Sequence, residues 1–248
     1  MAYQIKSQEE QEFLNNYRPG DYENPAVTTD MYLFGYRPSE KKMYTLLIQR
    51  GGHPCRGYWA FPGGFIEIDE SLEDAVAREL MEETSIEGIS CVQMYAWGEV
   101  DRDPRQRVIT VGHVALVNLD DVKPIAGDDA AKAGWFAIDQ ISCEKKEYEN
   151  QAGHRVVELK KQVTLTKDEL RFAPVILETR EYGKYLSSKS EIADDSKMAF
   201  DHARAAVDAI WFLRDQIQKT DITYNVFHKL ATPEQKQEIL DSLKIVEQ

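Results

Sequence analysis

Residues 63–86 constrain the fold of this chain more than any other stretch, because a glycine-bearing loop leads into a helix that carries glutamates where apolar residues belong. Ser71 can cap this helix, and Asp74 stands at the third position after the cap, which is close to a capping box. The pattern predicts a helix over 72–84, directly after the loop.

Three glutamates of this helix are the first candidate functional residues. At about 100° per residue, Glu79 and Glu83 fall within the arc that should face the core, and Glu82 falls at its edge; the arc is formed by Ala75, Val76 and Leu80. Carboxylates at such spacings on a partly buried face are costly unless a cation neutralises them. Mg²⁺ prefers carboxylate oxygens. The pattern favours a metal site over the alternative, a surface helix with a run of glutamates.

The same residues carry a family resemblance. Gly64, five residues, Glu70, seven residues, the run Arg78-Glu79-Leu80-Met81-Glu82-Glu83, one residue, a small residue and Ile86 together resemble the Nudix box. One position departs, because Ser85 stands where the family has the glycine that closes the helix in a left-handed conformation. The change alters no metal ligand.

Composition and charge exclude several classes of protein. The chain has 248 residues, 42% of them hydrophobic, which is enough for a packed core. A net charge of −13 argues against a general nucleic-acid or anionic-membrane surface. The three cysteines fit neither a disulfide framework nor a zinc motif, and we find no signal peptide or membrane-length apolar run. We therefore expect a cytoplasmic protein.

The order of elements predicts an α/β protein. We expect an N-terminal arm (1–25) with a short helix after Ser7, and then a core over 26–141. Strands are predicted at 26–36, 43–50, 90–99, 107–118 and 133–138, with Asp139 beginning a turn or helix. The Nudix resemblance implies that these elements form an α/β/α sandwich around a mixed sheet.

Two further segments follow the core. Residues 142–190 have the composition of a β-rich insertion. Residues 191–248 are predicted to be a C-terminal helical region, with an amphipathic helix over 197–218 and a last helix that Thr232 caps and that ends near Ile245. The segment resembles a shortened winged-helix remnant of Nudix-related regulators. Because it carries few basic residues and the sequence stops at Gln248, we expect no DNA binding.

Three other motifs make the resemblance more specific. They are Trp59-Ala-Phe-Pro-Gly-Gly-Phe, Asp101-Arg102-Asp103-Pro104-Arg105, and Gly127-Asp128-Asp129-Ala130 with Trp135-Phe136. These motifs are similar to those of the Nudix branch that hydrolyses ADP-ribose, a branch shared with transcriptional regulators of NAD metabolism. The resemblance covers roughly residues 26–141.

The resemblance implies roles for individual residues. The Gly63 carbonyl and the carboxylates of Glu79 and Glu83 would bind metal, and Glu82 would bind it directly or through water. Arg78 would orient a glutamate such as Glu70, unless it forms only an exposed ion pair.

Residues outside the helix are candidates for catalysis and substrate binding. Asp128 or Asp129 could serve as a general base, or both could belong to an acidic turn. Arg50, Arg102 and Arg105 could contact phosphate or ribose, although the last two could instead pair with neighbouring aspartates. Aromatic residues that could stack on adenine or belong to the core are Trp59 and Phe61. None of the five histidines has ligand spacing, so we expect them to be structural.

These observations predict a Nudix hydrolase that depends on Mg²⁺ (or Mn²⁺) and cleaves ADP-ribose to AMP and ribose 5-phosphate. One alternative is a Nudix hydrolase of another nucleoside diphosphate derivative. A second is a regulator that senses ADP-ribose without turnover. We also expect a homodimer and no membrane contact.

Overall fold

One mixed sheet runs through the protein in the computed structural model, which describes residues 4–18, 20, 23–126 and 130–247. Within these residues the strands follow the order β11-β10-β8-β7-β2-β1-β6-β5, and β3, β4, β9 and β12 pair with β2, β1, β8 and β7. The β1–β6 and β12–β7 pairs are parallel, and the other pairs are antiparallel. The α/β class and the mixed sheet are therefore confirmed.

The strands are β1 (Ala26–Arg37), β2 (Lys42–Arg50), β3 (Trp59–Ala60), β4 (Gly63–Phe65), β5 (Val92–Trp97), β6 (Val108–Asn118), β7 (Ala130–Glu149), β8 (Arg155–Lys167), β9 (Leu170–Phe172), β10 (Val175–Tyr182), β11 (Leu186–Asp194) and β12 (Ile245–Glu247). The helices are α1 (Gln8–Asn16), α2 (Leu72–Thr84), the 3-10 helix η2 (Leu119–Asp121), α3 (His202–Lys219), α4 (Tyr224–Phe227) and α5 (Pro233–Ser242). None of the described helices is long and apolar enough to cross a membrane.

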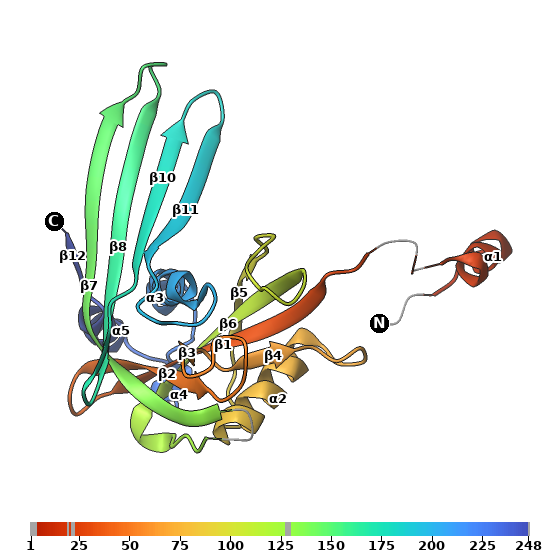
Figure 1. Ribbon diagram of the computed structural model, residues 1–248. Helices are drawn as coiled ribbons and strands as arrows, with labels where there is room; N and C mark the ends of the chain where they lie inside the picture. Colours follow the sequence, from red (N-terminus) through yellow and green to blue (C-terminus); the bar gives the residue numbers. More distant parts are fainter. Residues whose placement is uncertain (1–3, 19, 21–22, 127–129, 248) are drawn as a thin grey trace.

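Strand β1 is covered on both of its faces, by α2 on one side and by the C-terminal helices on the other. Met31 and Leu33 pack with Val76 and Leu80 of α2, whereas Tyr32 and other residues of the opposite face pack in the cluster that contains α3 and α5. Successive strand residues point to opposite faces, so a strand covered on both sides has a continuous apolar sequence. Figure 1 shows α2 and α3 on opposite sides of β1 and β6.

Helix α2 has the predicted bounds, and the Ser71 side chain accepts a hydrogen bond from the Asp74 N–H at 3.1 Å. Ser85 caps the other end with φ 58° and ψ 26°, a left-handed conformation. The serine therefore closes the helix as the family's glycine would, at some conformational cost.

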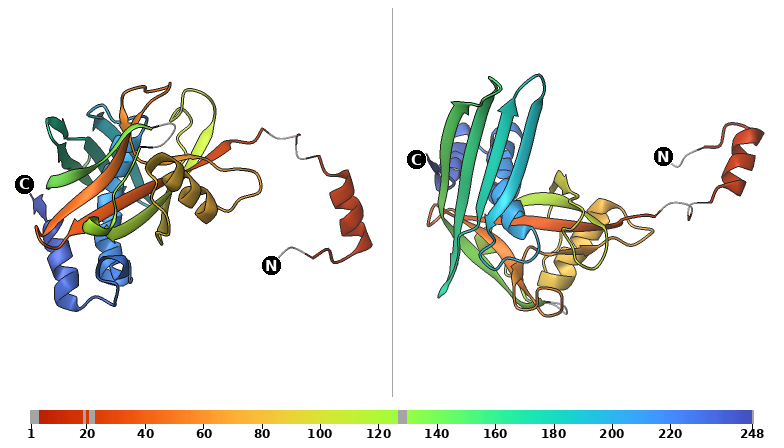
Figure 2. Two further views of the ribbon diagram at one scale, coloured as in Figure 1. Left: turned by 90° about the horizontal axis from the view of Figure 1, so that it is seen from below. Right: turned by 45° about the horizontal axis from the view of Figure 1, so that its top comes forward.

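The sheet extends well beyond the sandwich, and here one prediction is wrong. Asp139 begins neither a turn nor a helix, because β7 runs through it and stays paired with β8 from Ala137 opposite Thr166 to Glu149 opposite Arg155. A register shift between Ile138 and Gln140 places Asp139 at an irregularity, where its carboxylate pairs with Lys42 at 2.8 Å. Strands β7, β8, β10 and β11 project together from the core (Figures 1 and 2).

The expected domain limits fall inside strands of this extension. The limit between residues 141 and 142 lies within β7, and the limit between 190 and 191 lies within β11, which the sequence analysis did not predict. The C-terminal helical region is present, but α3 begins at His202 rather than near residue 197. Ser196, Lys197 and Phe200 all have positive φ, which a right-handed helix does not allow, so α3 begins only after them.

Candidate functional site

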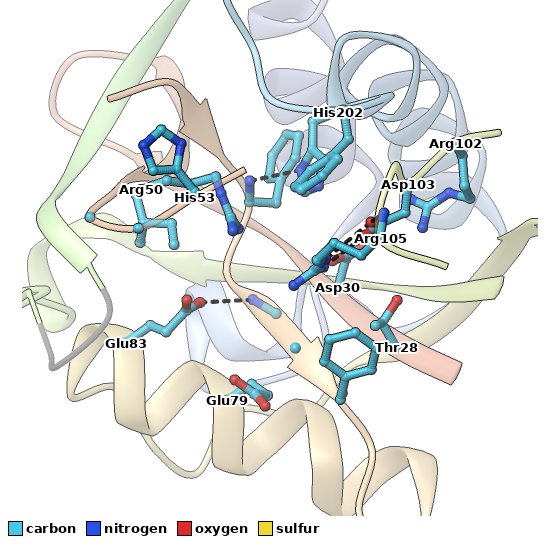
Figure 3. A pocket seen from close by; sticks show the side chains of 18 residues that line it. Thr28, Asp30, Arg50, His53, Glu79, Glu83, Arg102, Asp103, Arg105 and His202 are labelled. Carbon is cyan, nitrogen blue, oxygen red and sulfur yellow. Dashed lines mark hydrogen bonds and ion pairs between the residues drawn. The ribbon is translucent and has the colours of Figure 1, made fainter. Parts of the chain in front are cut away.

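A pocket of about 370 Å³ lies where α2, β1, the loop after β2 and the start of α3 meet. It is lined by Thr28, Asp30, Ile48, Arg50, Gly51, Gly52, His53, Phe61, Gly63, Gly64, Phe65, Glu79, Glu83, Arg102, Asp103, Arg105, Phe200 and His202. Figure 3 shows Glu79 and Glu83 on the α2 side, with Arg50 and Arg105 across from them. The pocket therefore has an acidic wall and a cationic wall.

Glu83 is the most buried acid of the acidic wall. Its side-chain Oε2 accepts a hydrogen bond from the Gly63 N–H at 2.8 Å. The pKa of Glu83 is raised to about 8, chiefly by burial and also by the nearby charges of Glu79 and Asp30, whereas the Gly63 hydrogen bond and Arg50 oppose the shift. Burial likewise raises the pKa of Glu79, although Arg78 opposes this. Burial therefore disfavours the ionised form of both carboxyls, and the positive charge near them does not offset this effect.

Glu82 differs from the other two glutamates. Its side chain is 55% exposed and pairs with Arg78 at 3.1 Å, and it does not line the pocket. Arg78 also binds Glu70 at 2.6 Å and Glu79 at 2.9 Å, which is the expected orienting contact. Among the described residues, no three His, Cys, Asp or Glu side chains are grouped closely enough to hold a metal. Of the three glutamates predicted to bind metal, Glu79 and Glu83 line the pocket and Glu82 does not.

The two glycines of β4 let the main chain pass close to its neighbours at the acidic wall. A Cβ atom added at Gly64 would lie 2.3 Å from the Glu79 Oε1 atom, and one at Gly63 would lie 2.2 Å from the Thr29 carbonyl oxygen. A side chain at Gly63 would meet main-chain atoms of β1, and one at Gly64 would displace the Glu79 carboxylate, so the close packing at the acidic wall depends on both residues being glycine.

The cationic wall combines two arginines predicted to bind substrate. Arg50 Nε donates to the Pro54 carbonyl at 3.0 Å. Arg105 pairs with Asp103, with Nη2 to Oδ2 at 2.7 Å, and its guanidinium lies 5.1 Å from the Phe65 ring centroid. Both arginines line the pocket. They can attract an anion across from the glutamates.

Other predicted binding residues have structural partners. Arg102 lines the pocket, but it forms two hydrogen bonds to Asp201, at 2.6 and 2.9 Å, and only 6% of its side chain is exposed. Trp59 lies in the core beside Phe136, with ring centroids 4.8 Å apart, and does not line the pocket. Phe61 does line it, stacked on His202. Trp59 is therefore a core aromatic rather than an adenine platform.

The pocket also contains residues that the sequence analysis missed. His202 is buried, and its Nδ1 accepts a hydrogen bond from the Phe61 N–H at 3.0 Å. Asp30 is buried and accepts from the Thr110 hydroxyl at 2.6 Å. An aspartate directly before the apolar run Met31–Phe34 of a strand was a signal for Asp30, whereas His202 had none. The candidate bases Asp128 and Asp129 lie outside the described residues.

Comparison with known proteins agrees with this geometry. The family model described as the NUDIX domain matches residues 30–160. That is more than half of the chain, so the protein belongs to the Nudix family.

Two curated relatives each match about half of this chain. The chain is 37% identical over 121 residues to a protein of Acinetobacter baylyi named ADPR responsive transcriptional repressor NtrR, covering 48% of each protein. It is also 37% identical over 120 residues to the ADP-ribose pyrophosphatase of Methanocaldococcus jannaschii, covering 48% of this chain and 66% of that one. The matched segments thus span 48% and 66% of these two curated relatives, which is less than two thirds of either.

One solved structure extends the likeness to nearly the whole chain. A MutT/nudix family protein from Enterococcus faecalis has a TM-score of 0.65 and 28% identity, covering 97% of this chain and 87% of that one. The arrangement of sheet extension and helices therefore recurs in another protein of the family.

Proposed function

We propose that the protein is a Mg²⁺-dependent Nudix hydrolase that cleaves the pyrophosphate of ADP-ribose to AMP and ribose 5-phosphate. The observation that supports this most is that one pocket holds a buried and a half-buried glutamate, Glu83 and Glu79, on one side and two arginines across from them. A pyrophosphate with a bound cation has the complementary charges, and the pyrophosphatase from Methanocaldococcus jannaschii is a relative at 37% identity.

The pocket residues fit a divalent cation. Burial holds the pKa of Glu83 at about 8, so at neutral pH its ionised form needs positive charge nearby. The Glu79 carboxylate lies against the main chain at Gly64, so a cation bound to it would lie beside β4. We propose that Glu79, Glu83 and the Gly63 carbonyl hold Mg²⁺ or Mn²⁺, and that Glu82 joins them by leaving Arg78. Such a cation neutralises phosphate oxygens and activates water when bound.

The chain's own residues would orient the substrate. Arg50 and Arg105 would bind non-bridging oxygens of the pyrophosphate, because guanidinium groups match phosphate geometry. Arg78 would hold Glu79 and Glu82 in place through its hydrogen bonds. Phe61 and Phe65 line the pocket and give an apolar surface for the base or ribose. We keep Asp128 and Asp129 as candidate general bases.

A substrate panel tests the proposal. The protein is incubated with Mg²⁺ and ADP-ribose, NAD, ADP-glucose or diadenosine polyphosphates, and AMP release is measured. We expect the fastest turnover with ADP-ribose. Faster turnover of another compound would favour a different nucleoside diphosphate substrate and contradict the proposed specificity. The matched control is Glu83→Gln, which should lower turnover by about two orders of magnitude or more.

The second candidate function is an ADP-ribose sensor that regulates transcription. One relative is named as such a repressor, and here the start of α3 forms part of the pocket wall, so a ligand would touch the helical region. Tight binding of ADP-ribose in the presence of Mg²⁺ with no AMP release would support the sensor and contradict the hydrolase. We still expect no DNA binding, which a mobility-shift assay would check.

We also propose a homodimer. The projecting sheet ends in β11, an edge strand whose residues are mostly exposed, and such an edge can pair with another chain. Light scattering coupled to size-exclusion chromatography measures the mass directly. A mass near that of a single chain at micromolar concentration would contradict this expectation.

A further inference from the structure

The segment before α3 is tied to the loop that leads into the acidic wall. The Ala199 N–H donates to the Trp59 carbonyl at 2.8 Å, and Met198 forms a parallel bridge with Trp59. Arg102 holds Asp201 by two hydrogen bonds, and His202 accepts from Phe61. This segment lies outside residues 30–160, the part that matches the family. It is nevertheless fixed at the pocket.

Phe200 occupies an unusual position in that segment. Its φ is 51°, in the left-handed region, where a bulky aromatic residue is disfavoured. The Arg50 guanidinium carbon lies 5.0 Å from the Phe200 ring centroid, and that of Arg105 lies 5.8 Å from it. One ring is therefore in contact range of both pocket arginines.

We infer that Phe200 is a positioning residue that holds Arg50 and Arg105 together as one anion-binding wall for the pyrophosphate group. Two guanidinium groups near one ring repel each other, and the negative face of the ring offsets part of that repulsion. The structure gives each arginine other partners too: the Pro54 carbonyl for Arg50, and Asp103 and Phe65 for Arg105.

Those partners do not connect the two arginines to each other. Pro54 lies on the loop after β2, and Asp103 lies on the loop between β5 and β6, whereas the Phe200 ring lies in contact range of both arginines. The disfavoured backbone conformation at Phe200 is maintained by the hydrogen bonds of its neighbours to Trp59 and Arg102. The inferred role rests on the proposed function for its substrate, but the inferred ligand is the pyrophosphate group itself.

Phe200→Gly tests this inference sharply, because glycine adopts the left-handed conformation without strain and removes only the ring. The ring is half-buried and packs against the cluster of Ile48, Ala60 and Ala199, so we expect its lost packing to offset the relieved strain and the melting temperature to change little. In EDTA, isothermal titration calorimetry with inorganic pyrophosphate should give a Kd raised about tenfold. With Mg²⁺ and ADP-ribose, KM should rise by a similar factor, about tenfold, while kcat changes less than about threefold.

Two control variants separate the ring from the backbone. Lys197→Gly relieves a left-handed residue in the same segment, at φ 64°, whose exposed side chain does not line the pocket. It should bind pyrophosphate as the unsubstituted protein does. Phe200→Tyr keeps an aromatic face and should restore affinity. If Phe200→Gly fails to fold, Phe200→Leu, which keeps an apolar side chain without a π face, must show the same loss.

The inference is overturned if the ring-less variant binds pyrophosphate normally, if Lys197→Gly loses affinity equally, or if the unsubstituted protein does not bind pyrophosphate. Failure of the proposed function has a different signature: pyrophosphate binds in a way that depends on Phe200, yet ADP-ribose releases no AMP with Mg²⁺. The two outcomes are therefore distinguishable in the same preparations.

Discussion

Replacing Glu83 with glutamine should stabilise the metal-free protein while removing its turnover. The Glu83 side chain is 8% exposed and accepts one hydrogen bond, from the Gly63 N–H. A glutamine oxygen can accept the same bond without carrying charge. The substitution therefore removes the cost of a buried carboxylate and keeps the shape of the site.

The magnitude follows from the shifted pKa of Glu83. The pKa rises from 4.5 to about 8, and each pKa unit corresponds to about 1.36 kcal/mol. At pH 7 the folded chain keeps this carboxyl protonated while the unfolded chain ionises it, which costs roughly 3 kcal/mol of folding stability. For a chain of this size that corresponds to a change in melting temperature of roughly 6–12 °C.

The sign of the pH dependence is fixed by the direction of the shift. Because the folded-state pKa of Glu83 is raised, its contribution to stability is fully present below pH 4.5 and is lost as the pH rises through about 8. Calorimetric melting in EDTA at about pH 5 and about pH 8 should show similar stabilities for the two proteins at the lower pH. At the higher pH, the glutamine variant should melt later.

The change in melting temperature on adding Mg²⁺ is the second part of the test. Mg²⁺ binds the folded state through the carboxylates, so it should raise the melting temperature of the unsubstituted protein more than that of Glu83→Gln. The reasoning fails if Glu83→Gln melts no higher than the unsubstituted protein at pH 8 in EDTA. It fails equally if the variant retains turnover of ADP-ribose within about threefold, since removing a ligand should cost far more.

Three further predictions concern stability. Ser85→Gly should stabilise by about 1 kcal/mol in urea denaturation, because the exposed residue is left-handed; a loss of stability would contradict this. Arg102→Met should cost about 3 kcal/mol by the same method, since it leaves Asp201 unpaired, and adding Asp201→Asn should recover part of the loss. Burial lowers the pKa of His202, so its contribution to stability is present above pH 6.5 and lost as pH falls towards the lower folded-state value; melting at pH 7.5 and 5 should show a smaller drop for His202→Gln.

The local parts of the fold and site could be predicted from the sequence. Helix α2 depends on its own residues: Ser71 caps it, and the apolar arc with Val76 and Leu80 faces the sheet. The same arc placed Glu79 and Glu83 inward, where the structure has them. Glu82 was placed at the edge, and it is exposed. Helical periodicity was sufficient here, because side-chain direction follows from position alone.

Longer-range features could not be predicted in this way. The polar residue Asp139 interrupts an apolar strand, and a turn or helix was the reasonable interpretation, yet β7 stays paired with β8 on both sides of that residue. Its carboxylate is accommodated by Lys42 of β2, a partner almost a hundred residues away. Strand propensity reports the surroundings of a residue as much as the residue itself, so the long β7 required knowledge of its neighbours.

The part of the pocket formed by the start of α3 could not be predicted from the sequence either, and it has a functional consequence. Phe200 falls within the amphipathic helix predicted over 197–218, and only the folded chain places it beside Arg50 and Arg105. Asp201 lies 99 residues from Arg102 in sequence, yet the pair is nearly buried. A ligand that moves Arg50 or Arg105 must therefore alter their contacts with Phe200, directly before α3. If ligand binding favours one packing of α3, linkage requires that stabilising this packing favours ligand binding by the same coupling free energy. A hydrolase and a sensor could both be built on this contact, and the difference between them lies in whether Glu79 and Glu83 complete the reaction.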